Sequence, residues 1–188
     1  MKRMLALILA LTACRVDTAA LPQPVTLTAE STGYYCQMTL LDHPGPKGQI
    51  HLDGLPGTPL FFSQVRDAVA YLRMPEQSRK VLVTYVNDMG AAPSWEQPGA
   101  NNWVPIGDVV FVMGSDMMGG MGAAELVPFK DPAKAEAFAK AHGGVVIALA
   151  DIPDSAVLTP TAQDGVAATG DDADYAERLR KLTQQAGG

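Results

Sequence analysis

Two kinds of hydrophobic pattern follow each other along the first half of the chain. Runs rich in aromatic and β-branched side chains predict strands over residues 34–40, 48–52 and 81–86. Between the second and third of these, residues 65–72 place apolar side chains at the i, i+3, i+4, i+7 spacing of a helix face, with Ser63 as the predicted N-cap. The first half is therefore predicted to fold as a β-β-α-β unit.

The same order of elements recurs in the second half. Strands are predicted over residues 109–113, 125–129 and 145–150. The helix between the last two strands is marked by Asp131 as N-cap, by a proline at its first position and by Gly143 as its stop signal. The predicted fold class is therefore α+β: two β-β-α-β units with small mixed sheets, a flexible N-terminal tether and a C-terminal tail.

The remaining segments flank or connect these units. Residues 88–102 surround Trp95 and are longer than a compact connection needs, so they form either a lid or a crossing between domains. From residue 154 the chain turns to Ala, Thr, Gly and Asp, which predicts disorder, with a short helix near the end. In chain order, the predicted organisation is a signal peptide (1–13), a lipid-anchored tether (14–32), the first unit (33–87), the connecting loop (88–102), the second unit (103–153) and a flexible tail (154–188).

The first residues have the pattern of a bacterial lipoprotein signal. Lys2 and Arg3 precede an apolar run over residues 4–11, and Leu-Thr-Ala-Cys ends at Cys14, which predicts cleavage before this cysteine and acylation of its sulfur. The run is far shorter than the roughly 20 residues that span a bilayer. The mature chain is therefore predicted to be periplasm-facing and tethered. An Asp directly after the acylated cysteine would favour retention at the inner membrane. This position holds Arg15, which favours the outer membrane.

Charge excludes some partners. The chain has 14 basic and 20 acidic residues, which gives a formal net charge of −6. This balance argues against nucleic acid, and against an electrostatic hold on anionic lipid.

Cys36 has no disulfide partner once Cys14 is assigned to the lipid anchor. A lone thiol in an oxidising compartment is prone to oxidation, so its retention requires burial or a ligand. In the predicted strand, Cys36 and Met38 point to the same face with Cα atoms about 7 Å apart. Thiolate and thioether are soft donors that favour Cu(I) over Zn(II), Ca(II) or Mg(II). The sequence therefore predicts a Cu(I) site at this pair.

A second concentration of sulfur comprises Met113, Met117, Met118 and Met121. The last three are embedded in glycines, which cannot build a packed layer, so a mobile loop that presents thioethers is favoured over a flexible turn with chance methionines. Met113 lies in an apolar strand and is assigned to the core.

The histidines are less specific. His43 follows Met38 by five residues in a Pro-Gly-rich turn, so it is either an imidazole ligand or a turn histidine bonded to the backbone. His51 lies in a predicted strand, and His142 lies near a helix C-terminus, where the helix dipole explains it. Neither is taken as a ligand. The chain has no Cys-x-x-Cys motif and no phosphate loop.

Together these motifs resemble the NosL family, the copper-binding lipoproteins that accompany bacterial nitrous oxide reductase. The resemblance covers residues 33–153. Its matching stretches are the lipobox at Cys14, Tyr35-Cys36-Gln37-Met38, His43-Pro44-Gly45-Pro46-Lys47, Met118-Gly119-Gly120-Met121-Gly122, Pro128-Phe129 and His142-Gly143-Gly144.

The resemblance implies a Cu(I) metallochaperone, not an enzyme, that delivers copper for maturation of the nitrous oxide reductase copper centres in denitrification. An ABC-transporter complex at the inner membrane, and also the reductase, are the implied partners. Cys36 and Met38 match the family's Cys-x-Met ligands, and Met121 matches the methionine of its glycine-rich loop. His43 and Met118 are further candidate ligands. Copper would then order residues 117–122 and join the two units.

Other interpretations stay open. A copper-sequestering tolerance lipoprotein would have the same site but no dedicated recipient. A thiol enzyme acting on small sulfur or organometallic compounds would use Cys36 as nucleophile, with His43 or His51 as base, although this leaves the methionines unexplained. A structural lipoprotein without a ligand is the third alternative.

Overall fold

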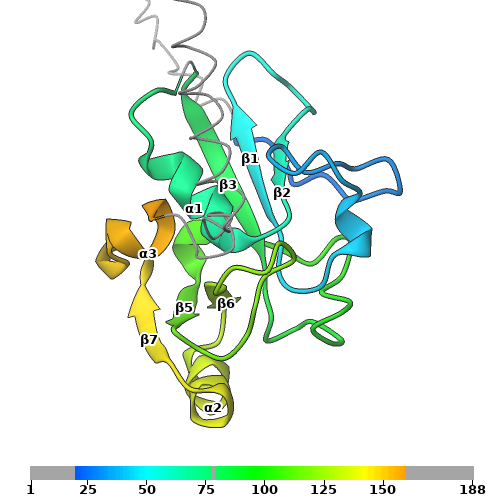
Figure 1. Cartoon of the computed structure of the whole chain (residues 1–188). Coiled ribbons are helices and arrows are strands. Elements are labelled where there is room, and N and C mark those ends of the chain that lie inside the picture. Colours follow the sequence, from blue (N-terminus) through cyan, green and yellow to red (C-terminus); the bar gives the residue numbers. More distant parts are fainter. Residues whose placement is uncertain (1–19, 78, 160–188) are drawn as a thin grey trace, which may run out of the picture.

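The computed structural model of the protein describes residues 20–77 and 79–159, so Cys14 and the helix predicted near the end of the chain lie outside the described residues. The described part contains two antiparallel sheets, each with its own helix, and confirms the α+β class (Figure 1). Within these residues, no helix combines the length and apolar character needed to cross a membrane.

The first sheet has four strands in the order β2-β1-β3-β4, and all pairs are antiparallel. One helix, α1, packs on it through a buried cluster that includes Ile50, Phe62 and Ala68. The elements of this unit are β1 (Gly48–Leu52), β2 (Leu60–Phe62), α1 (Val65–Arg73), β3 (Val81–Asn87) and β4 (Trp103–Pro105).

The second sheet has the strand order β6-β5-β7, again antiparallel, and α2 covers it through Ala135, which is buried against Val127 and Phe129. In Figure 1 this sheet and α2 lie below the first sheet and α1. The remaining elements are η1 (Leu40–Asp42), η2 (Ile106–Asp108), β5 (Val110–Met113), β6 (Val127–Phe129), α2 (Pro132–His142), β7 (Val145–Ala148), η3 (Leu149–Asp151) and α3 (Asp154–Leu158).

The two units share one hydrophobic core. Val65 and Val69 of α1 pack with Phe111 of β5 and with Leu126, and all four side chains are buried. Burial of apolar side chains stabilises by about 1.5–3 kcal/mol each, so this cluster is a strong connection. The units are therefore joined by apolar packing and do not need a metal ion to hold them together.

The predicted strand over residues 34–40 is wrong. The chain instead forms a tight loop in which Gln37 donates its backbone N–H to Gly33 O over 2.9 Å, and the Gln37 φ of 55° lies in the left-handed region that strands do not use. The second strand of the first unit is β2, a three-residue segment with two phenylalanines that follows a Pro-Gly turn. The N-cap of α1 is Gln64, and not Ser63.

The local signals of the second unit are confirmed. Asp131 caps α2 by accepting a hydrogen bond from the Ala133 backbone N–H over 2.9 Å, and Pro132 occupies the first position of the helix. Gly143 ends the helix with a φ of 75°, a conformation that favours glycine. Met113 packs against the shared core, as predicted.

Parts of both predicted flexible segments are packed on the body. Val25 exchanges two hydrogen bonds with the side chain of Gln49 in β1, and Leu27 is buried. At the other end, Val157 belongs to the shared core, and Asp154–Leu158 fold as α3 instead of starting a disordered tail. These segments were misjudged because their polar composition hides a few well-placed apolar residues.

The long loop around Trp95 connects β3 to β4 within the first sheet, so it is not a crossing between the units. The Trp95 carbonyl accepts a hydrogen bond from the Gly45 N–H over 2.7 Å, and the indole packs partly buried against the second unit's cluster. The loop therefore braces the turn that follows the cysteine.

Candidate metal centre

Cys36 lies in a short loop, residues 33–38, which we call the cysteine loop. The Gly33 N–H donates to Met38 O over 3.0 Å, and the Gln37 side chain donates to Tyr34 O over 2.7 Å. A Cβ atom at position 33 would lie only 2.5 Å from the Cys36 sulfur, so a side chain there would displace it. The thiol is half-buried and held in place by its own loop.

The methionine-bearing segment, residues 117–122, forms what we call the methionine arm. Gly119 donates its N–H to Ala123 O over 2.7 Å, and the Glu125 N–H donates to Met117 O over 3.1 Å. Met118 also pairs with Ala124 in an isolated antiparallel bridge. The arm is thus a small closed hairpin, which corrects the expectation of a mobile loop.

Cys36 and Met121 line the same pocket, which has a volume of about 250 Å³. The pocket is therefore lined by a thiol from the cysteine loop and a thioether from the methionine arm, although the two residues are far apart in sequence. Met38 and Met118 lie outside this pocket and are exposed, at 44% and 45%. The lining residues are Tyr35, Cys36, Gln64, Arg66, Asp67, Met121 and Ala123.

The donor set fits a soft ion. Across residues 20–77 and 79–159, no group of three or more His, Cys, Asp and Glu side chains is placed to hold a metal. Hard or borderline ions usually need such groups. A metal in this pocket would therefore depend on sulfur, and thiolate and thioether donors favour a soft ion.

His43 contacts the methionine arm instead of lining the pocket. Its Nδ1 lies 3.0 Å from the carbonyl oxygen of Gly120. His51 is bonded through Nε2 to Gln49, and His142 is bonded to Asp116 on the surface. No histidine of the described residues lines the Cys36 pocket, so the geometry provides no imidazole base beside the thiol.

Glu125 connects the methionine arm to α1, and no sequence signal revealed it. Its buried carboxyl group accepts hydrogen bonds from the backbone N–H groups of Val65 at 3.2 Å, Arg66 at 2.9 Å and Leu126 at 2.9 Å. Burial raises the pKa of Glu125 to about 8, while the N–H donors and Lys47 act in the opposite direction. The first turn of α1 is thus capped by a residue about 60 positions away.

Lys47 supplies a positive charge behind the cysteine loop. Its side chain is almost fully buried, and its ammonium group donates to the carbonyl oxygens of Pro44, over 2.8 Å, and Gly45. Burial lowers the pKa of Lys47 to about 8, while the charges of Glu125 and Cys36 act to raise it. A buried cation therefore lies within electrostatic reach of the thiol.

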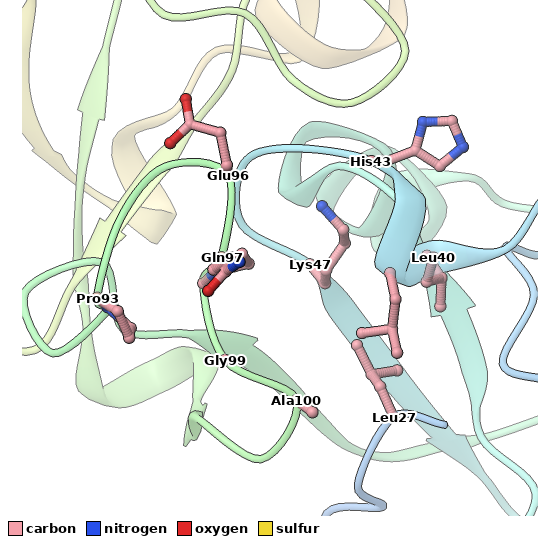
Figure 2. A pocket seen from close by; sticks show the side chains of 11 residues that line it. Leu27, Leu40, His43, Lys47, Pro93, Glu96, Gln97, Gly99 and Ala100 are labelled. Carbon is pink, nitrogen blue, oxygen red and sulfur yellow. The ribbon is translucent and has the colours of Figure 1, made fainter. Parts of the chain in front are cut away.

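A second pocket of about 250 Å³ has a different set of lining residues. Figure 2 shows loop residues 93–100 on one side and the segment that carries Leu40, His43 and Lys47 on the other. Its lining contains no sulfur, so it does not extend the donor set. His43, which lines this pocket, also contacts the methionine arm at Gly120 O.

The fold and the pocket together define a small α+β protein in which a β-β-α-β-β unit and a β-β-α-β unit share a core. One pocket is lined by a thiol and a thioether. The chain belongs to the NosL family, whose model matches residues 24–157.

Two relatives and one solved structure extend this result. The chain is 55% identical to the copper-binding lipoprotein NosL of Achromobacter cycloclastes over 179 residues, 95% of this chain and 92% of that protein. It is 30% identical to the copper-binding lipoprotein NosL of Stutzerimonas stutzeri over 141 residues, 74% of this chain and 70% of that protein. The crystal structure of the copper chaperone NosL from Shewanella denitrificans is similar, with a TM-score of 0.64 and 28% identity over 69% of this chain and 95% of that one.

Proposed function

We propose that the protein is a Cu(I) metallochaperone that delivers copper for maturation of the nitrous oxide reductase copper centres. The observation that carries this proposal is that Cys36 and Met121, two sulfur donors from different units, line one pocket. A soft ion is the cargo that such a pocket selects. The names of the relatives, copper-binding lipoproteins and a copper chaperone, support the same cargo.

Each donor has a distinct role in this proposal. Cys36 is the anionic anchor, and Met121 closes the site from the methionine arm. Met38 belongs to the cysteine loop but lies outside the pocket, so it is the ligand that must turn inward when copper binds. Met118 is the remaining thioether of the arm, while His43 is already engaged by the arm's backbone.

The exposure of the site suits delivery. Met121 is 41% exposed, so one side of the pocket is open to an approaching protein. A ligand from the recipient can bind the ion before Cys36 and Met121 release it, which avoids free copper in solution. Lys47 provides the countercharge that balances the thiolate while the ion is exchanged.

Location and partners belong to the same proposal. The anchor is acylated Cys14, which places the folded part on the periplasmic side of a membrane, with the outer membrane favoured by Arg15. The recipient is the ABC-transporter complex that matures the reductase, or the reductase itself. The relatives' designation as lipoproteins supports the anchor.

Copper binding is tested by anaerobic Cu(I) titration of the chain from residue 20 onward against a competing chelator. The parent is expected to bind one Cu(I) per chain with a sulfur-to-copper charge-transfer band. Loss of a residue that supports a metal ligand lowers metal affinity roughly 10–100-fold. Cys36→Ala removes a ligand itself, so it should lower the Cu(I) affinity by more than this. Met74→Leu, a surface thioether outside the pocket, is the matched control and should bind as the parent does.

Delivery is tested by mixing the copper-loaded protein with the metal-free maturation complex and following the copper after separation. Transfer to the complex, faster than release to buffer, is the expected result. Copper that stays on the protein in the presence of the complex would favour sequestration instead. A Cys36→Ala variant that binds Cu(I) as tightly as the parent would place the site elsewhere.

A further inference from the structure

We propose that Gln64 and His43 are positioning residues, which hold the methionine arm in place for Met121 before any metal arrives. This inference rests on the proposed function, because it assigns Met121 to the copper site. Both residues belong to the first unit, whereas the arm belongs to the second. They act on the backbone of the arm, and not on the ion.

Gln64 has a fixed orientation. Its Nε2 donates to the Asp67 carboxylate over 2.8 Å, and a carboxylate can only accept from an amide. The side-chain oxygen therefore faces the other way, where it accepts the backbone N–H of Met121 over 3.2 Å. Because Gln64 is buried, with 3% exposure, water does not readily replace this bond.

His43 holds the neighbouring peptide. Gly120 O can only accept a hydrogen bond, so Nδ1 of His43 carries the proton over the 3.0 Å separation. This bond crosses from the turn after the cysteine loop to the methionine arm. His43 thus fixes the arm relative to the segment that carries Cys36, which is a different role from metal ligation.

Two glycines make these contacts sterically possible. A Cβ on Gly119 would lie 2.6 Å from both the Gln64 side-chain oxygen and a Glu125 carboxyl oxygen. A Cβ on Gly120 would lie 2.7 Å from the Cβ of His43. These glycines therefore serve close approach, and not loop mobility. An arm that is already placed does not have to be ordered when the ion binds, which favours affinity.

The test uses Gln64→Leu, which keeps the bulk of the side chain but removes the acceptor. Amide hydrogen exchange of the metal-free protein should show about a tenfold or greater loss of protection at Met121, the change expected for one lost hydrogen bond. Cu(I) affinity should fall by a similar factor, while the thiolate-to-copper absorption band remains, because Cys36 is untouched.

The matched control is Gln77→Leu. The Gln77 side chain is also bonded to the backbone, as a donor to the Tyr71 carbonyl, but at the opposite end of α1. This variant should change neither Met121 protection nor Cu(I) affinity. A general loss of stability would lower protection across the core in both variants, whereas the positioning role predicts a change confined to the arm in Gln64→Leu alone.

A second variant, His43→Phe, tests the proposal independently if Gln64→Leu does not fold. His43→Phe removes the bond to Gly120 O from a separate segment and should also lower Cu(I) affinity and protection within residues 117–122. If both variants keep the parent's protection and affinity, the positioning role is wrong while the copper site stands. If the parent itself binds no Cu(I), the proposed function fails, and the exchange pattern still decides whether Gln64 and His43 hold the arm.

Discussion

The two main helices begin in different ways. The N-terminus of α2 is capped by Asp131, the residue directly before the helix, which accepts the Ala133 N–H. The N-terminus of α1 has a glutamine at the N-cap position that makes no side-chain cap bond, and its free N–H groups go to Glu125 of the other unit. The N-terminus of α2 is therefore capped by a neighbouring residue, whereas that of α1 is capped by a tertiary contact.

The two caps should differ in whether they affect copper binding as well as stability. The cap of α2 is a hydrogen bond between two residues at the start of that helix. The cap of α1 also fixes the residues next to the methionine arm, because Glu125 lies shortly after the arm in sequence and packs against Gly119. A change at the α1 cap should therefore alter both folding and copper binding, whereas a change at the α2 cap should alter folding alone.

The largest effect is expected for Glu125→Ala. Three backbone N–H groups lose their buried acceptor, and each such group costs about 1–3 kcal/mol. The free energy of unfolding should therefore fall by several kcal/mol in urea titrations, and Cu(I) affinity should fall with it. A variant with parent stability would contradict the assignment of Glu125 as the α1 cap.

The pH dependence of stability sharpens the same assignment. The folded pKa of Glu125 is about 8, above its ordinary value of 4.5, so between these values the folded protein holds a proton that the unfolded chain has lost. Its contribution is fully present below pH 4.5 and is lost as pH rises through 8. The stability advantage of the parent over Glu125→Gln should thus shrink as pH rises across this window, by up to about 1.4 kcal/mol per pH unit. Equal pH profiles would show that Glu125 does not titrate in this way.

An intermediate effect is expected for Gly119→Ala. The new methyl group would lie 2.6 Å from atoms of two buried side chains, Gln64 and Glu125. Overpacking of this kind costs about 1–3 kcal/mol and should push the methionine arm away from α1. Gly107→Ala is the control, because nothing lies within 4 Å of the added Cβ. Thermal unfolding and Cu(I) competition compare the two, and a Gly119 variant that resembles the control in both would contradict the close packing of the arm.

The smallest effect is expected for Asp131→Ala, which removes the local cap of α2. Loss of such a cap costs about 1 kcal/mol. Urea unfolding should detect this decrease, while Cu(I) affinity should equal that of the parent, because α2 does not line the site. A clear loss of Cu(I) affinity would show that the two helix starts are not as different as the structure indicates.

The sequence predicted the features that depend on neighbouring residues. Each correct signal lies within a few positions of the element it defines. These signals are the apolar face of α1, the Asp131 cap and the Gly143 stop. The choice of Cys36 and Met121 as candidates rested on their chemistry and on the family resemblance, and the structure places both in one pocket.

Two kinds of feature were not predicted: the shape of one short loop and the contacts between distant residues. The cysteine loop resembles a strand in composition, but the left-handed Gln37 and the Gly33 hydrogen bonds decide its shape. The roles of Gln64 and Glu125 arise from contacts across about 60 positions, for which a single sequence has no periodic signal. The glycines of the methionine arm suggested mobility, whereas their packing shows that they permit close approach.

The central claim is that one Cu(I) ion is held by sulfur from both units, with Met121 closing the site opposite Cys36. Copper K-edge X-ray absorption of the Cu(I)-loaded parent, Met121→Leu and the surface control Met74→Leu tests this directly. The account predicts that Met121→Leu loses one sulfur scatterer from the copper shell, while Met74→Leu keeps the parent spectrum. A Met121→Leu spectrum identical to that of the parent would contradict it.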